Sequence, residues 1–237
     1  MKNPFKSLIA ALLPQRCAYC LKAIASNALM CSECEKDLPR IIGTVCPKCG
    51  REKEACTCKG ADMYYSAIAA PFYYRGKVRR GIHAFKFRKY SQNADAYAVE
   101  MAETVKDRFG TIKFDFITEV PMTKRSLKKR GYDQGALLAE KVSRILSIEH
   151  KNNVLTKLYE TDKQHNLSFY LRRGNLTGVF DVIDPSAVDG KTILIADDIS
   201  TSGETLNECA KMLWLYGAKD IYCITVALTV YEKKKNS

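Results

Sequence analysis

The sequence predicts an α/β domain built around a mainly parallel sheet, preceded by a small cysteine-rich module. Two observations carry this prediction. Eight of the ten cysteines fall before residue 59 in closely spaced pairs, which is typical of a metal-binding module. After them, β-rich segments alternate with segments of helical periodicity, as in proteins with a parallel sheet. We expect the cysteine-rich module to span residues 1–60 and the α/β domain to span residues 61–237.

The cysteines form pairs with metal-ligand spacing: Cys17 and Cys20, Cys31 and Cys34, Cys46 and Cys49, Cys56 and Cys58. Two thiolates separated by two residues converge easily on one tetrahedral ion, so the pattern predicts one or two structural zinc ions. A disulfide framework is the alternative, and it needs an oxidising compartment. Sequential and cross-braced pairing of the four pairs both fit these spacings. Cys209 and Cys223 stand alone among apolar residues and are expected in the core.

The N-terminus superficially resembles a short signal peptide, with two lysines followed by an apolar run. Pro14-Gln-Arg16 stands where a small-residue cleavage site would be needed, however. The apolar residues also recur at helical spacing, which favours a short amphipathic helix: Phe5, Leu8, Ile9, Leu12 and Leu13. No segment approaches the ~20 apolar residues that cross a bilayer. We therefore expect a cytoplasmic protein without membrane insertion.

The chain of 237 residues has a net charge of +12, and the excess is concentrated in two places. Residues 71–91 contain seven basic and no acidic side chains, and residues 124–130 contain five more basic ones. Such clusters suit polyanions, either nucleic acid or the phosphates of a small substrate. A solvated basic surface is the alternative. With 46% apolar residues the chain can form a sizeable core.

Periodicity and turn residues place the elements of the α/β domain in order. Runs of β-branched and aromatic residues predict strands at residues 65–74, 115–120, 179–182, 192–196 and 220–230. Apolar side chains that recur every three or four positions predict helices at residues 78–90, 94–108, 135–146 and 203–216. Gly217, directly after the last helix, is the usual residue at a helix C-terminus.

The segment after the 192–196 strand is the candidate ligand site. Two adjacent carboxylates, Asp197 and Asp198, lead into a polar loop before a helix: Ser200, Thr201, Ser202, Gly203, Glu204 and Thr205. Ligands of parallel sheets bind beyond the carboxyl ends of strands, and the N-terminus of a helix favours anions. Carboxylates beside an anion would repel it unless they bind a hydrogen-bond donor, such as a ribose hydroxyl, or a cation. Simple helix capping by one of these residues is the alternative, and it leaves the acidic pair unexplained.

Residues 193–205 resemble the phosphoribosyl pyrophosphate motif of type I phosphoribosyltransferases, with Ser202 where threonine is commoner. The wider pattern, from about residue 12 to residue 230, resembles the ComF family, whose double zinc ribbon matches the cysteine-rich head. Further matching stretches are Lys86-Phe87, Pro121 with residues 130–134, and residues 164–180. The family usually has asparagine where this chain has Asp133, which leaves the contact of that side chain open. The resemblance implies a type I phosphoribosyltransferase-like fold.

The resemblance also implies roles for single residues. Asp197 and Asp198 would contact the ribose hydroxyls, with Mg²⁺ on the pyrophosphate side, and residues 201–205 would hold the 5-phosphate. Candidates to neutralise the departing pyrophosphate are Lys86, Arg125 and Arg130. A mobile catalytic hood would contain Gln164, Arg172 and Arg173, for which an ordinary polar loop is the alternative. This chemistry uses no histidine, so we expect surface or packing positions for His83, His150 and His165.

Two functions follow from the resemblance. The first is a Mg²⁺-dependent phosphoribosyltransferase that moves phosphoribose to an unknown acceptor. The second is a non-catalytic adaptor of the competence machinery, in which the basic surfaces and the zinc head contact single-stranded DNA beside a partner helicase. The hood residues Arg172, Arg173 and Asn175, present together with an intact acidic pair, favour enzyme-like binding of phosphoribosyl pyrophosphate. We also expect a link to DNA uptake in natural transformation.

Overall fold

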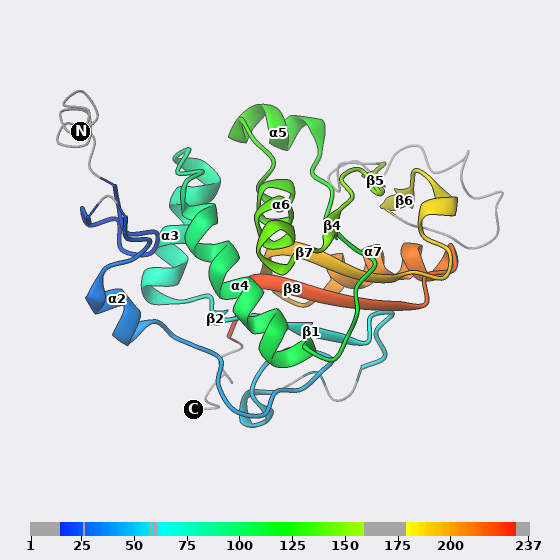
Figure 1. Cartoon of the computed structure of the whole chain (residues 1–237), viewed down its shortest axis with the longest axis horizontal. Helices are drawn as coiled ribbons and strands as arrows, with labels where there is room; N and C mark the ends of the chain where they lie inside the picture. Colours follow the sequence, from blue (N-terminus) through cyan, green and yellow to red (C-terminus); the bar gives the residue numbers. More distant parts are fainter. Residues whose placement is uncertain (1–14, 26, 57, 59–60, 159–178, 231–237) are drawn as a thin grey trace, which may run out of the picture.

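The computed structural model describes residues 15–25, 27–56, 58, 61–158 and 179–230 (Figure 1). Its main sheet is entirely parallel, with the strand order β1-β8-β7-β3-β4. These strands are β1 (Ala67–Ala69), β8 (Asp220–Leu228), β7 (Thr192–Ser200), β3 (Phe116–Glu119) and β4 (Glu149–His150). A further strand, β2 (Phe72–Tyr73), also pairs with β8. The predicted α/β class with a parallel sheet is confirmed.

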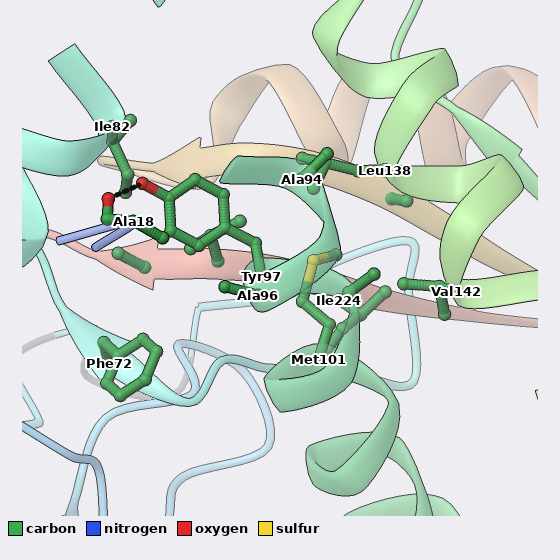
Figure 2. Packing of buried hydrophobic residues seen from close by; sticks show 14 of the residues in the cluster. Ala18, Phe72, Ile82, Ala94, Ala96, Tyr97, Met101, Leu138, Val142 and Ile224 are labelled. Carbon is green, nitrogen blue, oxygen red and sulfur yellow. Dashed lines mark hydrogen bonds between the residues drawn. The ribbon is translucent and has the colours of Figure 1, made fainter. Parts of the chain in front are cut away.

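Helices cover both faces of this sheet. One face packs against α3 (Gly76–Phe87), α4 (Asn93–Phe109) and α6 (Gln134–Leu146), and the other face packs against α7 (Glu204–Leu215). Figure 2 shows the first of these cores, where Met101, Leu138 and Ile224 meet between the helices and the sheet. Cys209 and Cys223 are fully buried in the second core, as predicted.

The remaining elements lie around this body. The cysteine-rich module contains α2 (Ser32–Asp37) and the short 3-10 helix η1 (Lys53–Ala55). A separate antiparallel pair joins β5 (Leu155–Lys157) to β6 (Phe180–Val182), and the 3-10 helix η3 (Pro185–Ala187) follows it. The amphipathic helix expected near the N-terminus lies outside the described residues. Every helix in the described part of the chain is too short or too polar to cross a bilayer.

Two predicted strands need correction, and one helix was not predicted. The strand expected at residues 65–74 is divided into β1 and β2, because Pro71 has no N–H for the sheet. The strand expected to end at Ala196 continues to Ser200, because β8 is equally long and pairs with it throughout. A helix, α5 (Lys124–Arg130), occupies the basic cluster where no element was predicted. It begins where the hydroxyl of Thr123 accepts the N–H of Ser126, 3.1 Å away.

Candidate functional site

The eight N-terminal cysteines form two compact clusters, paired sequentially. In each cluster the four sulfur atoms lie within 4.8 Å of one another: Cys17, Cys20, Cys31 and Cys34 in the first, and Cys46, Cys49, Cys56 and Cys58 in the second. Neighbouring sulfurs are 3.5 Å apart for Cys56 and Cys58 and 3.6 Å apart for Cys20 and Cys31. These distances exceed a disulfide bond and approach the roughly 3.8 Å edge of a zinc–thiolate tetrahedron. Both clusters therefore fit a Zn²⁺ ion, and all ten cysteines are free thiols.

The backbone favours the thiolate form of one cysteine in each cluster. Burial opposes ionisation of Cys17, but the N–H groups of Cys20, Tyr19 and Cys31 outweigh it and lower its pKa to about 7. Burial of Cys46 is likewise outweighed by the N–H groups of Cys49 and Lys48, which lower its pKa to about 7. The thiolate is the form that binds zinc. Four such ligands leave no open coordination position, so the zinc is structural.

The first zinc ribbon (residues 17–34) packs into the core of the body through Tyr19, and one of its carbonyl groups accepts hydrogen bonds from α4. The carbonyl oxygen of Ala18 accepts the hydroxyl of Tyr97 at 2.8 Å, drawn dashed in Figure 2, and the amide of Asn93 at 3.1 Å. A Cβ atom on Gly81 of α3 would lie only 2.1 Å from the same oxygen. Since α3 approaches the ribbon so closely, the ribbon fixes the helix that carries Lys86.

Lys86 reaches the acidic pair at the end of β7. Its Nζ atom lies 2.7 Å from Oδ1 of Asp198, and only 17% and 8% of the two side chains are exposed. Successive side chains of a strand point to opposite faces, so Asp198 faces α3 whereas Asp197 faces α7. Consistent with this placement, burial and then the Asp197 charge raise the pKa of the Cys209 thiol on α7. The structure therefore brings together three of the predicted site residues from distant parts of the chain.

The carboxyl group of Asp197 is perturbed. Burial, and next the charge of Asp198, raise its pKa to about 7, although Lys86 acts in the opposite direction. Its Oδ1 atom accepts the N–H of Asp198 at 2.7 Å. Asp197 therefore changes charge near neutral pH, which is characteristic of functional sites.

The hydroxyl loop (residues 201–205) leads from β7 into the first turn of α7. Thr201, Ser202, Glu204 and Thr205 are exposed, whereas Ser200 is buried within β7 instead of lying in the loop. Gly203 precedes the helix with φ of +88°, a conformation that other residues rarely adopt. A Cβ atom at this position would also lie 3.2 Å from the hydroxyl of Tyr65. The loop thus presents hydroxyls and amides at the N-terminus of a 12-residue helix, where anions are favoured.

The other predicted basic residues lie at the edge of this site or beyond the described chain. Arg130, at the end of α5, donates to Oε1 of Gln134 at 2.7 Å, and its guanidinium lies 5.6 Å from the ring of Phe87. It is therefore next to the end of α3 that carries Lys86. Arg125 is exposed on α5. The proposed hood residues Gln164, Arg172 and Arg173 lie outside the described residues.

Two further acidic residues border the site: Glu119, which was not predicted, and Asp133, whose contact the resemblance left open. Glu119 ends β3 beside Ala196 of β7, and its Oε2 atom lies 2.9 Å from Nε2 of His150, for which only a surface or packing position was expected. Asp133 caps α6 by accepting the N–H of Ala136 at 2.9 Å. Burial raises the pKa of Asp133, and the nearby charge of Glu119 adds to this effect. In the sequence, a role for Glu119 in the site was indicated by its position at the end of a predicted strand, two residues before Pro121.

Arg51 was also missed, although it directly follows the Cys49-Gly50 turn of the second zinc ribbon (residues 46–58). Only 4% of it is exposed. Its Nη2 atom donates to the carbonyl oxygen of Thr201 at 2.9 Å, and its Nε atom donates to that of Thr229 at 2.9 Å. The zinc module therefore contacts the hydroxyl loop through a buried guanidinium.

Comparisons with known proteins agree with this arrangement. A family model for a double zinc ribbon domain matches residues 8–66, and one for a phosphoribosyl transferase domain matches residues 133–237. DNA utilization protein YhgH of Escherichia coli O157:H7 is 30% identical over 223 residues, which cover 90% of this chain and 97% of the relative. Competence protein F of Haemophilus influenzae is 28% identical over 217 residues, covering 87% and 93%.

Among solved structures, a glutamine phosphoribosylpyrophosphate amidotransferase from B. subtilis aligns with a TM-score of 0.41 and 18% identity, covering 56% of this chain and 26% of that one. The sequence relatives extend over nearly the whole chain, and the two family models match its zinc module and the C-terminal part of its α/β domain. The chain therefore belongs to the ComF family, with a double zinc ribbon followed by a domain of the phosphoribosyltransferase type.

Proposed function

We propose that this protein binds phosphoribosyl pyrophosphate at the end of β7 and transfers its phosphoribosyl group in a Mg²⁺-dependent reaction. The observation that carries the proposal is the juxtaposition of Asp197, the Lys86–Asp198 ion pair and the exposed hydroxyl loop at the carboxyl end of one central strand. The carboxylates are acceptors for ribose hydroxyls, and the loop offers N–H and O–H donors to the 5-phosphate.

The chemistry of the residues suits loss of pyrophosphate from the donor. As the bond to the anomeric carbon breaks, positive charge develops on the ribose, and the carboxylates of Asp197 and Asp198 stabilise it. Lys86 at the end of α3 and Arg130 at the end of α5 are the cationic groups of the site. In this proposal they stabilise the negative charge of the departing pyrophosphate. Mg²⁺ prefers oxygen ligands and commonly takes one or two carboxylates together with substrate phosphates, which the acidic pair and the donor would supply. The bound ion would add charge neutralisation at the pyrophosphate.

Calorimetry of phosphoribosyl pyrophosphate binding, with and without Mg²⁺, tests the proposal on zinc-loaded protein. We expect micromolar, Mg²⁺-dependent binding that is lost in the double variant Asp197→Asn with Asp198→Asn. The matched control is Asp95→Asn with Asp107→Asn, which removes two exposed carboxylates from α4 and leaves binding unchanged. Wild-type affinity in the first variant, with normal zinc content, would show that the site lies elsewhere. If the wild-type protein binds the donor as expected, release of pyrophosphate would serve to screen acceptors.

A second candidate function is contact with single-stranded DNA, in keeping with a role of the family in DNA uptake. It is favoured by an exposed aromatic pair, in which Tyr64 and Trp214 have ring centroids 5.4 Å apart and Nζ of Lys211 lies 5.8 Å from the Tyr64 ring. The pair borders a hollow of about 250 Å³ that Lys48 and Lys219 also line. Aromatic side chains beside cationic groups form stacking platforms for single-stranded nucleic acid. In this alternative the protein is an adaptor without turnover.

Fluorescence anisotropy with labelled single-stranded DNA in a salt series tests the second function. Binding through phosphate contacts gives affinity that falls steeply with salt. Trp214→Ala should weaken binding, whereas Trp214→Phe keeps an aromatic face and should retain most of it. A flat salt dependence, or equal affinity of the two variants, would argue against this surface.

A further inference from the structure

The second zinc ribbon is pressed against the part of the sheet that carries the hydroxyl loop. The N–H of Ile68 in β1 donates to the carbonyl oxygen of Pro47 at 2.9 Å. A Cβ atom on Gly50 would lie 2.8 Å from Cδ1 of Leu228 and 2.9 Å from the carbonyl oxygen of Ile68. This close approach requires glycine, and it holds the following residue, Arg51, against the end of β8.

The side chain of Arg51 connects three segments. Besides its bonds to Thr229 and Thr201, its Nη1 atom lies 3.5 Å from the carbonyl oxygen of Cys49, a zinc-cluster residue. The backbone of Arg51 is also tied to the cluster, because its carbonyl oxygen accepts the N–H of Cys46 at 2.8 Å. A guanidinium has several donors in a fixed plane, so the positions of these carbonyl groups are fixed relative to one another.

The bond to Thr201 determines the orientation of a peptide group in the hydroxyl loop. In a trans peptide the C=O of one residue and the N–H of the next point in opposite directions, and the structure has no cis peptide bond among its described residues. When Arg51 draws the Thr201 carbonyl inward, the N–H of Ser202 points away from the ribbon. Ser202 is exposed, and this orientation of the peptide group would present its N–H to an anion bound at the loop.

Tyr65, which lies just before β1, contacts both the second ribbon and the hydroxyl loop. Its hydroxyl donates to the carbonyl oxygen of Lys48 at 2.8 Å, and the ring is almost fully buried. The same hydroxyl would contact a Cβ atom at Gly203 at 3.2 Å, so it lies directly beneath the turn that starts α7. Two buried side chains thus link the Cys46–Cys49 turn to the hydroxyl loop, one at Thr201 and one at Gly203.

We propose that Arg51 is a positioning residue through which the second zinc ribbon holds the hydroxyl loop in its anion-binding conformation. This inference rests on the proposed function of the loop in binding the donor phosphate. Arg51 acts from beneath the loop through the Thr201 carbonyl. The second ribbon is then a part of the donor site, and its metal supports the turn from which Arg51 extends.

The test compares Arg51→Met with Arg16→Met. Arg16 directly precedes the first ribbon and donates to the carbonyl oxygen of Leu21 in that ribbon at 3.0 Å, so it controls for loss of an arginine–carbonyl bond. Two quantities are measured on protein with verified zinc content: the affinity for phosphoribosyl pyrophosphate with Mg²⁺, and amide hydrogen exchange across residues 200–206. Arg51→Met should weaken binding about tenfold or more and speed exchange in this segment, because hydrogen bonds to a charged donor are lost. Arg16→Met should change neither.

A second variant, Arg51→Lys, keeps the charge but offers one nitrogen that cannot satisfy two separated carbonyls. We expect intermediate exchange and affinity, and this variant carries the test if Arg51→Met loses zinc or fails to fold. Wild-type exchange and affinity in zinc-loaded, folded Arg51 variants would overturn the inference. If the wild-type protein does not bind the donor, the proposed function fails, and exchange across residues 200–206 alone decides whether Arg51 positions the loop.

Discussion

Replacement of Lys86 by methionine tests the electrostatics of the site most directly. Methionine preserves much of the packing of the lysine stem and removes the charge that lies 2.7 Å from the Asp198 carboxylate. Since both side chains are largely buried, the change leaves a buried acidic group without its cationic partner. Breaking a buried ion pair in this way costs about 3–5 kcal/mol. For a chain of this size that cost corresponds to a decrease in Tm of roughly 6–20 °C.

The loss of stability in Lys86→Met should also depend on pH, because Lys86 lowers the pKa of Asp197. The pKa of Asp197 in the folded protein, about 7, lies above the ordinary aspartate value of 3.8, so the folded state holds a proton that the unfolded state releases. Stability from this group therefore falls as pH rises through that window. Without Lys86 the pKa of Asp197 rises further, and the fall continues above pH 7. The difference in Tm between variant and wild type should accordingly be larger at pH 8 than at pH 6.

Thermal unfolding of Lys86→Met at the two pH values measures this effect, with Lys77→Met as the matched control. Lys77 lies on the same helix and pairs with Asp37 at 2.9 Å, but the aspartate is 75% exposed and water screens the pair. We expect a small change in Tm for the control at either pH. Equal shifts for the two variants, or a Lys86→Met shift that is the same at pH 6 and pH 8, would refute the reasoning.

Three further predictions concern zinc, Asp133 and Asp197. Metal analysis of dialysed protein should find about two zinc ions per chain that a strong chelator removes, since two four-cysteine clusters are present, and a metal-free disulfide-linked protein would contradict this. Asp133→Asn should raise Tm at pH 8, because asparagine caps α6 equally well while the raised pKa of the aspartate makes its ionisation destabilising. The gain should shrink as pH falls toward 3.8, the ordinary value for aspartate, and thermal scans with no pH-dependent gain would count against this. Affinity for phosphoribosyl pyrophosphate should weaken as pH falls from 8 to 6, because Asp197 gains a proton near pH 7 and loses acceptor capacity. Calorimetry should find this pH dependence reduced in Asp197→Asn.

Local patterns in the sequence predicted much of the fold. The helical periodicity of residues 135–146 and 203–216 corresponds closely to α6 and α7, because an apolar stripe specifies both the helix and the face that it buries. The end of β7 was predicted less well. Three of its last four residues are polar, so composition indicated a loop, whereas the ladder to β8 keeps the strand extended as far as Ser200. Backbone pairing with a distant strand decided the boundary.

The candidate site likewise consists of local motifs that the sequence showed and of long-range contacts that it did not. The motif of residues 197–205 and the spacing of the cysteines are local, and they indicated the proposed anion site and the metal module without a structure. The Glu119–His150 pair and the contact of Arg51 with Thr201, which spans 150 residues, have no local pattern. Both depend on which strand ends lie side by side.

The sequence by itself determined the two modules, the thiolate ligands, the buried periodicity and the polar loop at the carboxyl end of a strand. The tertiary structure alone decided that the zinc pairs are sequential, that Lys86 meets Asp198, and that the second ribbon supports the loop from below. The physical reason is that spacing and periodicity act over a few residues along the chain. Ion pairs and buried hydrogen bonds instead join groups that approach one another only after the sheet order and the helix packing have formed.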